Sequence, residues 1–189
     1  MRRCLAGIAA LPYEGSGHRH IMNLAQSPHI PAEGTKPSLR DAAWLVPVAA
    51  RGFVELVRAR VAFARLEAKA IPLRNQAAKR AASDKKRIGE AKLARMAYVL
   101  PRLSDRLPWR SDCLVQAIAA QNWLASMGAA GEIQIGVENP ADGNFGAHAW
   151  LMHEGQVVTG GDISRYDLIY SDSRAGRHSD ATDEKAEPD

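Results

Sequence analysis

Cysteine is scarce in this chain, whose 189 residues include only Cys4 and Cys113. Two cysteines, one of them close to the N-terminus, provide neither a disulfide framework nor a four-cysteine metal site. A reducing compartment is therefore the simpler interpretation, because structural disulfides belong to oxidising ones. We expect a cytoplasmic protein that uses no cofactor.

Long apolar runs and the common nucleotide-binding motifs are also missing from the sequence. The apolar region that follows residue 38 is too polar to span a membrane, because four arginines interrupt it: Arg51, Arg58, Arg60 and Arg65. The chain contains no Walker-type loop, dinucleotide fingerprint or internal repeat. Membrane-spanning, nucleotide-binding and repeat architectures are therefore not indicated.

The composition is that of an ordinary globular protein, with 46% hydrophobic residues. The length fits one domain with additional ends, and we place this domain at residues 38–170. Helices are expected over 38–100, and a catalytic helix and sheet over 111–170. Residues 1–37 combine prolines with small residues and histidines, and residues 171–189 are polar and mostly acidic. Both ends are predicted to be disordered.

The first helix of this domain has a recognisable start. Ser38 and Asp41 resemble a capping box with aspartate in place of glutamate, so a helix is predicted to run from there to about Ala70. Pro47 must then lie in its first turns or kink it. The core candidates on this helix are Trp44, Val48, Leu56, Phe63 and Leu66.

Residues 74–95 form a basic run, with eight basic residues against two acidic ones. The resulting charge of +6 exceeds the +4 of the whole chain. One interpretation is a solvated helix face with a linker near Ser83. The other is a docking surface for an acidic peptide or protein around Lys85, Lys86 and Arg87. No aromatic residue is interleaved for base stacking, so nucleic-acid binding is not indicated.

The most informative stretch begins at Ser111-Asp112-Cys113. Ser111 is a good N-cap residue and Asp112 favours the positive end of a helix, so a helix is predicted to start here with Cys113 in its first turn. Unpaired N–H groups and the helix dipole stabilise a thiolate at that place. The following residues are apolar on nearly all sides, which is typical of a central helix. A buried structural thiol is the alternative interpretation.

Two strands are predicted downstream of this helix. Alternating apolar residues indicate one strand over Gly131–Glu138 and another over Phe145–His153, with a loop of turn-forming residues between them. His148 lies on the second strand, on the face that it shares with Trp150. His153, at the end of this strand, is expected to be solvated.

Glu154-Gly155 predicts a tight hairpin into a return strand that leads to Gly160-Gly161-Asp162. Regular pairing across this turn would place Gly161 opposite His148 and would turn Asp162 to the other face. A bulge at the paired glycines would re-aim the carboxylate.

These residues resemble a known family. Cys-Leu-x-x-Ala from Cys113, a Gly-Val strand, Ala-His-Ala-Trp around His148 and a glycine-containing hairpin are similar to the transglutaminase-like superfamily of papain-type cysteine enzymes. Within it they resemble the B proteins of lasso-peptide biosynthesis, which remove the leader from a precursor peptide. The resemblance covers residues 39–170. It implies an α+β fold in which N-terminal helices precede a cysteine-bearing helix packed on a small antiparallel sheet.

The resemblance also implies roles and partners. Cys113 would be the nucleophile, His148 the general base and acid, and Asp162 the orienting carboxylate, with Asp167 as the reserve for that last role. The expected partners are the leader region of the precursor peptide, a separate leader-recognition protein and an ATP-dependent macrolactam synthetase. Two alternatives stay open: transfer of the acyl group to an amine by the same site, and a non-enzymatic basic interaction module in which Cys113 is inert.

Overall fold

The structure of the chain is a computed structural model, which describes residues 30–31, 38–65, 70–82, 88–109, 112–138 and 146–171. The predicted disordered ends lie almost entirely outside these ranges, and so do Lys85, Lys86 and Arg87 of the basic run. Among the helices within these ranges, none combines the length and the apolar character that crossing a bilayer requires.

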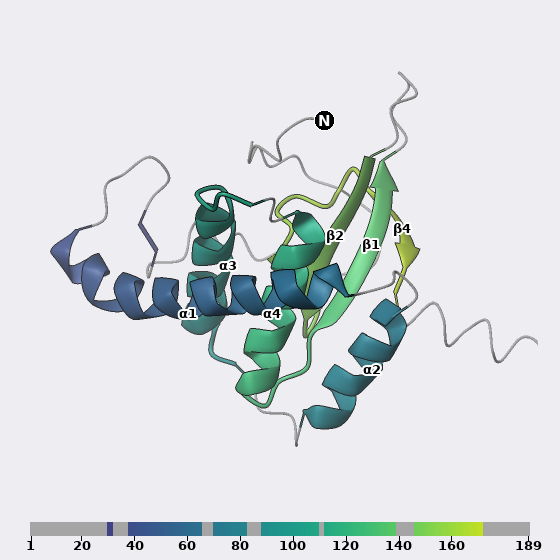
Figure 1. Ribbon diagram of the computed structural model, residues 1–189, viewed down its shortest axis with the longest axis horizontal. Coiled ribbons are helices and arrows are strands. Elements are labelled where there is room, and N and C mark those ends of the chain that lie inside the picture. Colours follow the sequence, from purple (N-terminus) through teal and green to yellow (C-terminus); the bar gives the residue numbers. More distant parts are fainter. Residues whose placement is uncertain are drawn as a thin grey trace, which may run out of the picture.

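In the described part of the chain four helices come first and four strands follow (Figure 1). The helices are α1 (Leu39–Ala64), α2 (Ile71–Ala81), α3 (Glu90–Ser104) and α4 (Cys113–Ser126). The strands are β1 (Glu132–Glu138), β2 (Gly146–His153), β3 (Gln156–Thr159) and β4 (Asp167–Tyr170). They form one antiparallel sheet in the order β3-β2-β1-β4. The predicted α+β class is confirmed, including the cysteine-bearing helix that precedes a small sheet.

Helix α1 begins with the predicted capping box. The Ser38 side chain accepts a hydrogen bond from the backbone N–H of Asp41, and the Asp41 carboxylate accepts from the N–H of Ser38. Pro47 lies inside the helix, which ends at Ala64, earlier than predicted. Of its predicted core residues only Leu56 is fully buried, and Leu66 lies outside the described residues; Trp44, Val48 and Phe63 are partly buried.

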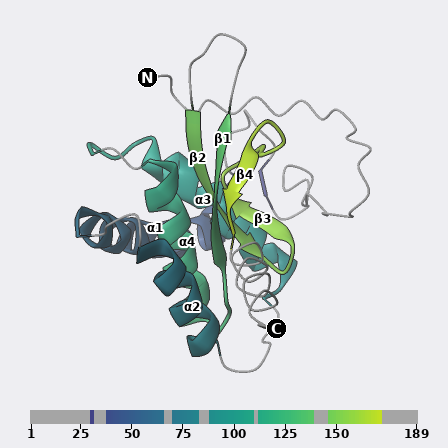
Figure 2. The same ribbon diagram turned by 90° about the vertical axis from the view of Figure 1, so that its right-hand side faces the viewer.

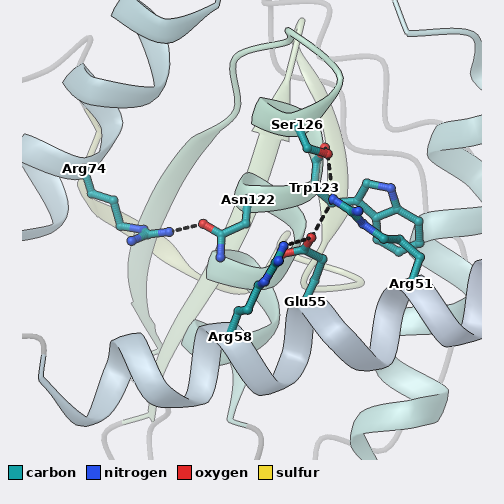
Figure 3. Close-up of polar contacts among 7 residues, drawn as sticks. All are labelled: Arg51, Glu55, Arg58, Arg74, Asn122, Trp123 and Ser126. Atoms are coloured by element: carbon teal, nitrogen blue, oxygen red, sulfur yellow. Dashed lines mark hydrogen bonds and ion pairs between the residues drawn. The ribbon is translucent and has the colours of Figure 1, made fainter.

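A buried carboxylate ties α1 to α4 (Figure 3). Glu55 is almost fully buried, and its Oε1 atom lies 2.7 Å from a guanidinium nitrogen of Arg51 and 3.3 Å from one of Arg58. Arg51 also donates to the Ser126 hydroxyl of α4 at 2.9 Å. A carboxylate is costly to bury unless it is paired, so the two arginines make this burial possible. Arg51, one of the arginines that interrupt the apolar run, therefore links α1 to α4.

Helix α2 is attached to the sheet through one amide side chain. Asn75 is completely buried; its Nδ2 donates to the carbonyl of Ile133, and its Oδ1 accepts from the Ile133 N–H, each at 2.9 Å. Gln121 of α4 donates to the same Oδ1 at 2.9 Å. The Asn75 amide thus pairs with β1 as a neighbouring strand would, at a point that β4 does not reach, because β4 pairs only with residues 135–137.

Helix α4 is the centre of the hydrophobic core, as its apolar sequence predicts. Its fully buried side chains pack with residues of α1, α3 and the sheet, in a cluster that includes Leu56, Leu100, Ile118, Leu124, Ile133 and Leu151. Helices α1, α2 and α4 lie on one side of the strands (Figure 2). This packing fixes the N-terminus of α4, where Cys113 lies, against β2.

Candidate active site

Cys113 is the first residue of α4, so the prediction that it lies in the first helical turn is confirmed. The N-cap residue is Asp112 rather than the predicted Ser111, which lies outside the described residues, and the Asp112 side chain makes no capping hydrogen bond. The first N–H groups of a helix have no partner within the helix. The thiol is half-buried, so it combines partial access with the electropositive end of a central helix.

A backbone amide of β2 points at the sulfur. The N–H of Ala149 donates to Cys113 Sγ at a distance of 3.4 Å. Strand β3 pairs with β2 only at residues 151–153, so it does not extend along β2 as far as Ala149. The thiol occupies this uncovered edge, beside the residue that follows His148. The structure thus places the predicted nucleophile against the backbone of the residue that follows the predicted base.

The His148 imidazole is buried on the sheet face opposite the helical core. It shares this face with Trp150, since their cross-strand partners on β1 are Gly136 and Gln134, and the Trp150 indole N–H donates to Gln134 at 3.0 Å. The predicted placement of His148 and Trp150 on one face is confirmed. Tyr166 stacks on the imidazole with ring centroids 4.7 Å apart.

Three influences act on the pKa of His148, two of which lower it and one of which raises it. Burial lowers it most, and the positive charge of Arg165 lowers it further, while the hydrogen bond to Gly160 raises it. The net effect is a pKa below the ordinary histidine value of 6.5. The imidazole is therefore neutral at pH 7, the state in which it can accept a proton.

The acceptor at His148 differs from the predicted one. The Nε2 atom lies 2.7 Å from the backbone carbonyl oxygen of Gly160. The Asp162 carboxylate instead accepts from the backbone N–H of Ser164 at 2.9 Å, which closes a local turn. The predicted contact between Asp162 and His148 is not formed, and a catalytic role for this carboxylate stays a prediction.

A bulge does occur, but at Val158, two residues before the paired glycines where it was predicted. Met152 faces Val157 in the hairpin, whereas Leu151 faces Thr159, so one residue of β3 is skipped. Continued pairing in the new register would bring Asp162 opposite His148. Strand β3 ends at Thr159, however, and the chain leaves the sheet at Gly160, before that pair can form.

The structure also places Asp167 and His153, the two other residues singled out in the sequence. Asp167 begins β4 and is exposed; its cross-strand partner is Val137, so it lies on the face opposite His148. The prediction that His153 is solvated is wrong, because it is buried and its Nδ1 lies 2.6 Å from the carbonyl oxygen of Ala130. A polar end residue can be buried where a neighbouring loop supplies a backbone acceptor.

Three residues around the imidazole were not predicted from the sequence: Gly160, Arg165 and Tyr166. The guanidinium of Arg165 lies over the Tyr166 ring at 5.1 Å and donates to its hydroxyl at 3.1 Å. All three belong to the segment between β3 and β4, whose path depends on where β3 ends. In the sequence, only the paired glycines Gly160-Gly161 indicated anything here, namely an irregularity in the strand pairing.

The described residues offer no evident metal centre, since no three or more His, Cys, Asp or Glu side chains are grouped to hold an ion. A separate hollow lies between the end of α2, the α4–β1 connection and the β2–β3 hairpin, with Lys79, Gly131 and Met152 in its wall. Neither Cys113 nor His148 lines it. The chemistry available at the N-terminus of α4 is therefore that of a thiol, an imidazole and backbone groups.

Comparison with known proteins identifies a family for this chain. A family model described as the transglutaminase-like superfamily matches residues 53–171, which span most of the described helices and all four strands. Searches among curated proteins and among solved structures found no significant match.

Proposed function

Because the chain belongs to the transglutaminase-like superfamily, whose members are generally cysteine-dependent enzymes, we propose that it is a cysteine peptidase that removes the leader from a lasso-peptide precursor. The superfamily itself implies a peptidase or an acyltransferase. The narrower assignment is supported by the resemblance of the residues around Cys113 and His148 to the B proteins of lasso-peptide biosynthesis.

The observation that carries the catalytic part of the proposal is the position of the thiol. Cys113 Sγ lies at a helix N-terminus and accepts a hydrogen bond from the Ala149 N–H, and Ala149 directly follows the buried His148 in β2. A thiolate at this place is stabilised by the helix dipole and by the amide. The same arrangement supports a nucleophile better than it supports an inert thiol, which needs no hydrogen-bond donor.

The proposed reaction proceeds through an acyl-enzyme. His148 takes the proton of the Cys113 thiol, and the sulfur attacks the carbonyl carbon at the end of the leader. The peptide C–N bond breaks as the imidazolium returns the proton to the leaving amine, which becomes the N-terminus of the core peptide. Water, deprotonated by His148, then hydrolyses the thioester. The leader leaves with a carboxylate, and the thiol is restored.

Leader removal in this pathway requires partner proteins. The leader is expected to be presented by a separate recognition protein, and the core peptide to pass to an ATP-dependent macrolactam synthetase. A reduced Cys113 is needed throughout, which fits a reducing, cytoplasmic compartment. The basic run at residues 74–95 is a candidate docking surface for such a partner, although part of it packs inside the fold, since Arg74 is hydrogen-bonded to Asn122 of α4 (Figure 3).

The test uses the precursor peptide that this protein is proposed to process, with its recognition protein added. Mass spectrometry should detect a free leader and core peptide with the wild-type chain, and no cleavage with Cys113→Ala. The Cys4→Ser variant is the control, and it should cleave at the wild-type rate. With this variant, iodoacetamide should label Cys113 in the folded protein well below pH 8.5, the ordinary pKa of a thiol.

Three results would decide against parts of the proposal. Unchanged cleavage by Cys113→Ala would rule out the cysteine mechanism. A leader joined to an added amine, in place of a free carboxylate, would identify an acyltransferase. A thiol that is labelled only after unfolding, in a chain without activity, would favour the non-enzymatic interaction module.

A further inference from the structure

We propose that the backbone carbonyl of Gly160, rather than the carboxylate of Asp162, orients the catalytic imidazole of His148. This inference rests on the proposed function, because it assigns the group that positions the base of that reaction. It adds a backbone atom to the site, at the position where the sequence predicts an acidic side chain.

The hydrogen bond to Gly160 determines which ring nitrogen of His148 carries the proton. A carbonyl oxygen can only accept, so Nε2, which lies 2.7 Å from it, must be the N–H donor. In the neutral ring the other nitrogen, Nδ1, then has a free lone pair. The tautomer needed for a base that acts through Nδ1 is thus fixed without any charged partner.

The local backbone holds the carbonyl of Gly160 in place. Gly160 has a φ angle of +115°, which residues with a side chain rarely adopt. A Cβ atom at this position would lie only 2.4 Å from the Cβ of Trp150 and 3.3 Å from His148 Nε2. The absence of a side chain therefore lets the backbone lie directly against the two aromatic residues, with its oxygen on the ring nitrogen.

The Asp162 carboxylate serves a different purpose in this arrangement. Its Oδ1 accepts from the Ser164 N–H, and this turn starts the segment that carries Tyr166 back over the imidazole. Hydrogen bonding to Ser164 is also the main reason why the pKa of Asp162 is lowered. The turn therefore accounts for the position of the Asp162 carboxylate and for its lowered pKa.

A neutral acceptor has a chemical consequence. A carboxylate beside His148 would stabilise the imidazolium and raise the pKa of the ring. An uncharged carbonyl stabilises the imidazolium less and therefore raises this pKa less. The other groups near the ring are the Tyr166 phenol, the Trp150 indole and the guanidinium of Arg165 over the Tyr166 ring. No carboxylate among the described residues contacts the ring to oppose the effect of burial.

The first experiment compares Asp162→Asn with the wild-type chain. Asparagine can still accept from the Ser164 N–H, so the turn is kept and only the charge is removed. Cleavage of the precursor should stay within about threefold of wild type, whereas removal of the orienting acid of a catalytic triad lowers turnover by about 10⁴. A loss of that size with Asp162→Asn would overturn the inference.

The second experiment records the ¹⁵N resonances of the His148 ring and does not depend on activity. They should show Nε2 protonated and Nδ1 bare near pH 7, with the same ring pKa in wild type and Asp162→Asn. Protonated Nδ1, or a ring pKa that falls in Asp162→Asn, would overturn the inference. A chain that cleaves no precursor would defeat the proposed function, while these spectra would still decide which group holds the ring.

The third experiment weakens the acceptor itself. Glycolic acid in place of Gly161 converts the Gly160 carbonyl into an ester carbonyl, a poorer acceptor, without adding atoms. It should shift the Nε2–H resonance and lower kcat more than it raises KM, because the base and not the binding surface is affected. The same replacement at Gly155 in the exposed hairpin is the control. If the two ester variants had the same Nε2–H resonance, kcat and KM, the proposed role of the Gly160 carbonyl would be contradicted.

Discussion

The paired glycines after β3 allow a sharp test of the structure, because alanine should have very different effects at two adjacent positions. Gly160 and Gly161 both have positive φ angles, +115° and +65°. A Cβ at Gly160 would collide with the Cβ of Trp150 at 2.4 Å, whereas a Cβ at Gly161 would meet nothing within 4 Å. Backbone strain acts at both positions, but the steric clash acts at only one.

The magnitudes follow from these two effects. Gly160→Ala should lose about 1–3 kcal/mol to the rarely adopted backbone angle and a further ~1–3 kcal/mol to overpacking, so about 2–6 kcal/mol in the free energy of unfolding. Gly161→Ala occupies the left-handed region that alanine tolerates at a cost of about 1–2 kcal/mol. Part of that loss is offset by the lower entropy of the unfolded chain, so roughly 1 kcal/mol is expected.

Urea unfolding followed by circular dichroism measures both values. With a slope of about 2 kcal/mol per molar urea, Gly160→Ala should unfold ~1–3 M earlier than wild type, and Gly161→Ala roughly 0.5 M earlier. Equal midpoints for the two variants would refute the close contact between Gly160 and Trp150. Where both variants are folded, only Gly160→Ala should show impaired cleavage, since only this change displaces the carbonyl that contacts His148.

Two further predictions test the electrostatics of the site and the attachment of α2. Arg165 lowers the pKa of His148, so Arg165→Gln should raise it and move the acidic limb of the kcat/KM profile to higher pH; Arg165→Lys, which keeps the charge, should not. An identical shift in both would show that the contact, and not the charge, matters. Asn75→Ala removes the side chain that pairs with the buried N–H and C=O of Ile133 and one of the two acceptors of the Gln121 amide, so it should destabilise the fold by about 3 kcal/mol in urea unfolding. Alanine at the exposed Gln76 should have little effect.

The pH dependence of stability has a definite sign. A histidine whose pKa is lowered by folding binds protons more readily in the unfolded chain. The contribution of His148 is therefore complete above its unfolded pKa of about 6.5 and is lost as the pH falls below that value towards the lower folded pKa. Acidification should thus weaken the fold from about pH 6.5 downward, and the proposed base catalysis should be lost at lower pH, as the pH falls through the folded pKa.

The sequence predicts those parts of the fold that depend on local patterns. The capping box at Ser38, the apolar helix after Cys113 and the hairpin at Glu154-Gly155 have short-range signals, and all three are present. In the hairpin both turn residues have positive φ angles, +47° and +81°, as a tight turn of this kind requires. Local chemistry therefore suffices to locate the helix that begins at Cys113 and the strand that carries His148.

The wrong or missing predictions in the sheet depend on how one segment pairs or packs with another. Strand β4 has only four residues, and it forms because β1 offers an edge to it. His153 is buried because the Ala130 carbonyl reaches it across the α4–β1 connection. The bulge opposite Leu151 shifts the register by one residue, and no signal in Gln156–Thr159 announces it. Such events depend on tertiary packing, which a periodic pattern does not encode.

The early end of β3 links these observations into one explanation of the site. Because pairing stops at Thr159, the edge of β2 at Ala149 stays uncovered, and the N-terminus of α4 can bring Cys113 to it. The same break releases Gly160 from the sheet, so that its carbonyl turns onto the ring of His148. A longer β3 would take the Ala149 N–H for itself and would carry the Gly160 carbonyl into the ladder. Cys113, His148 and the Gly160 carbonyl are therefore positioned together by the termination of a single strand, and a substitution that extends β3 should displace all three at once.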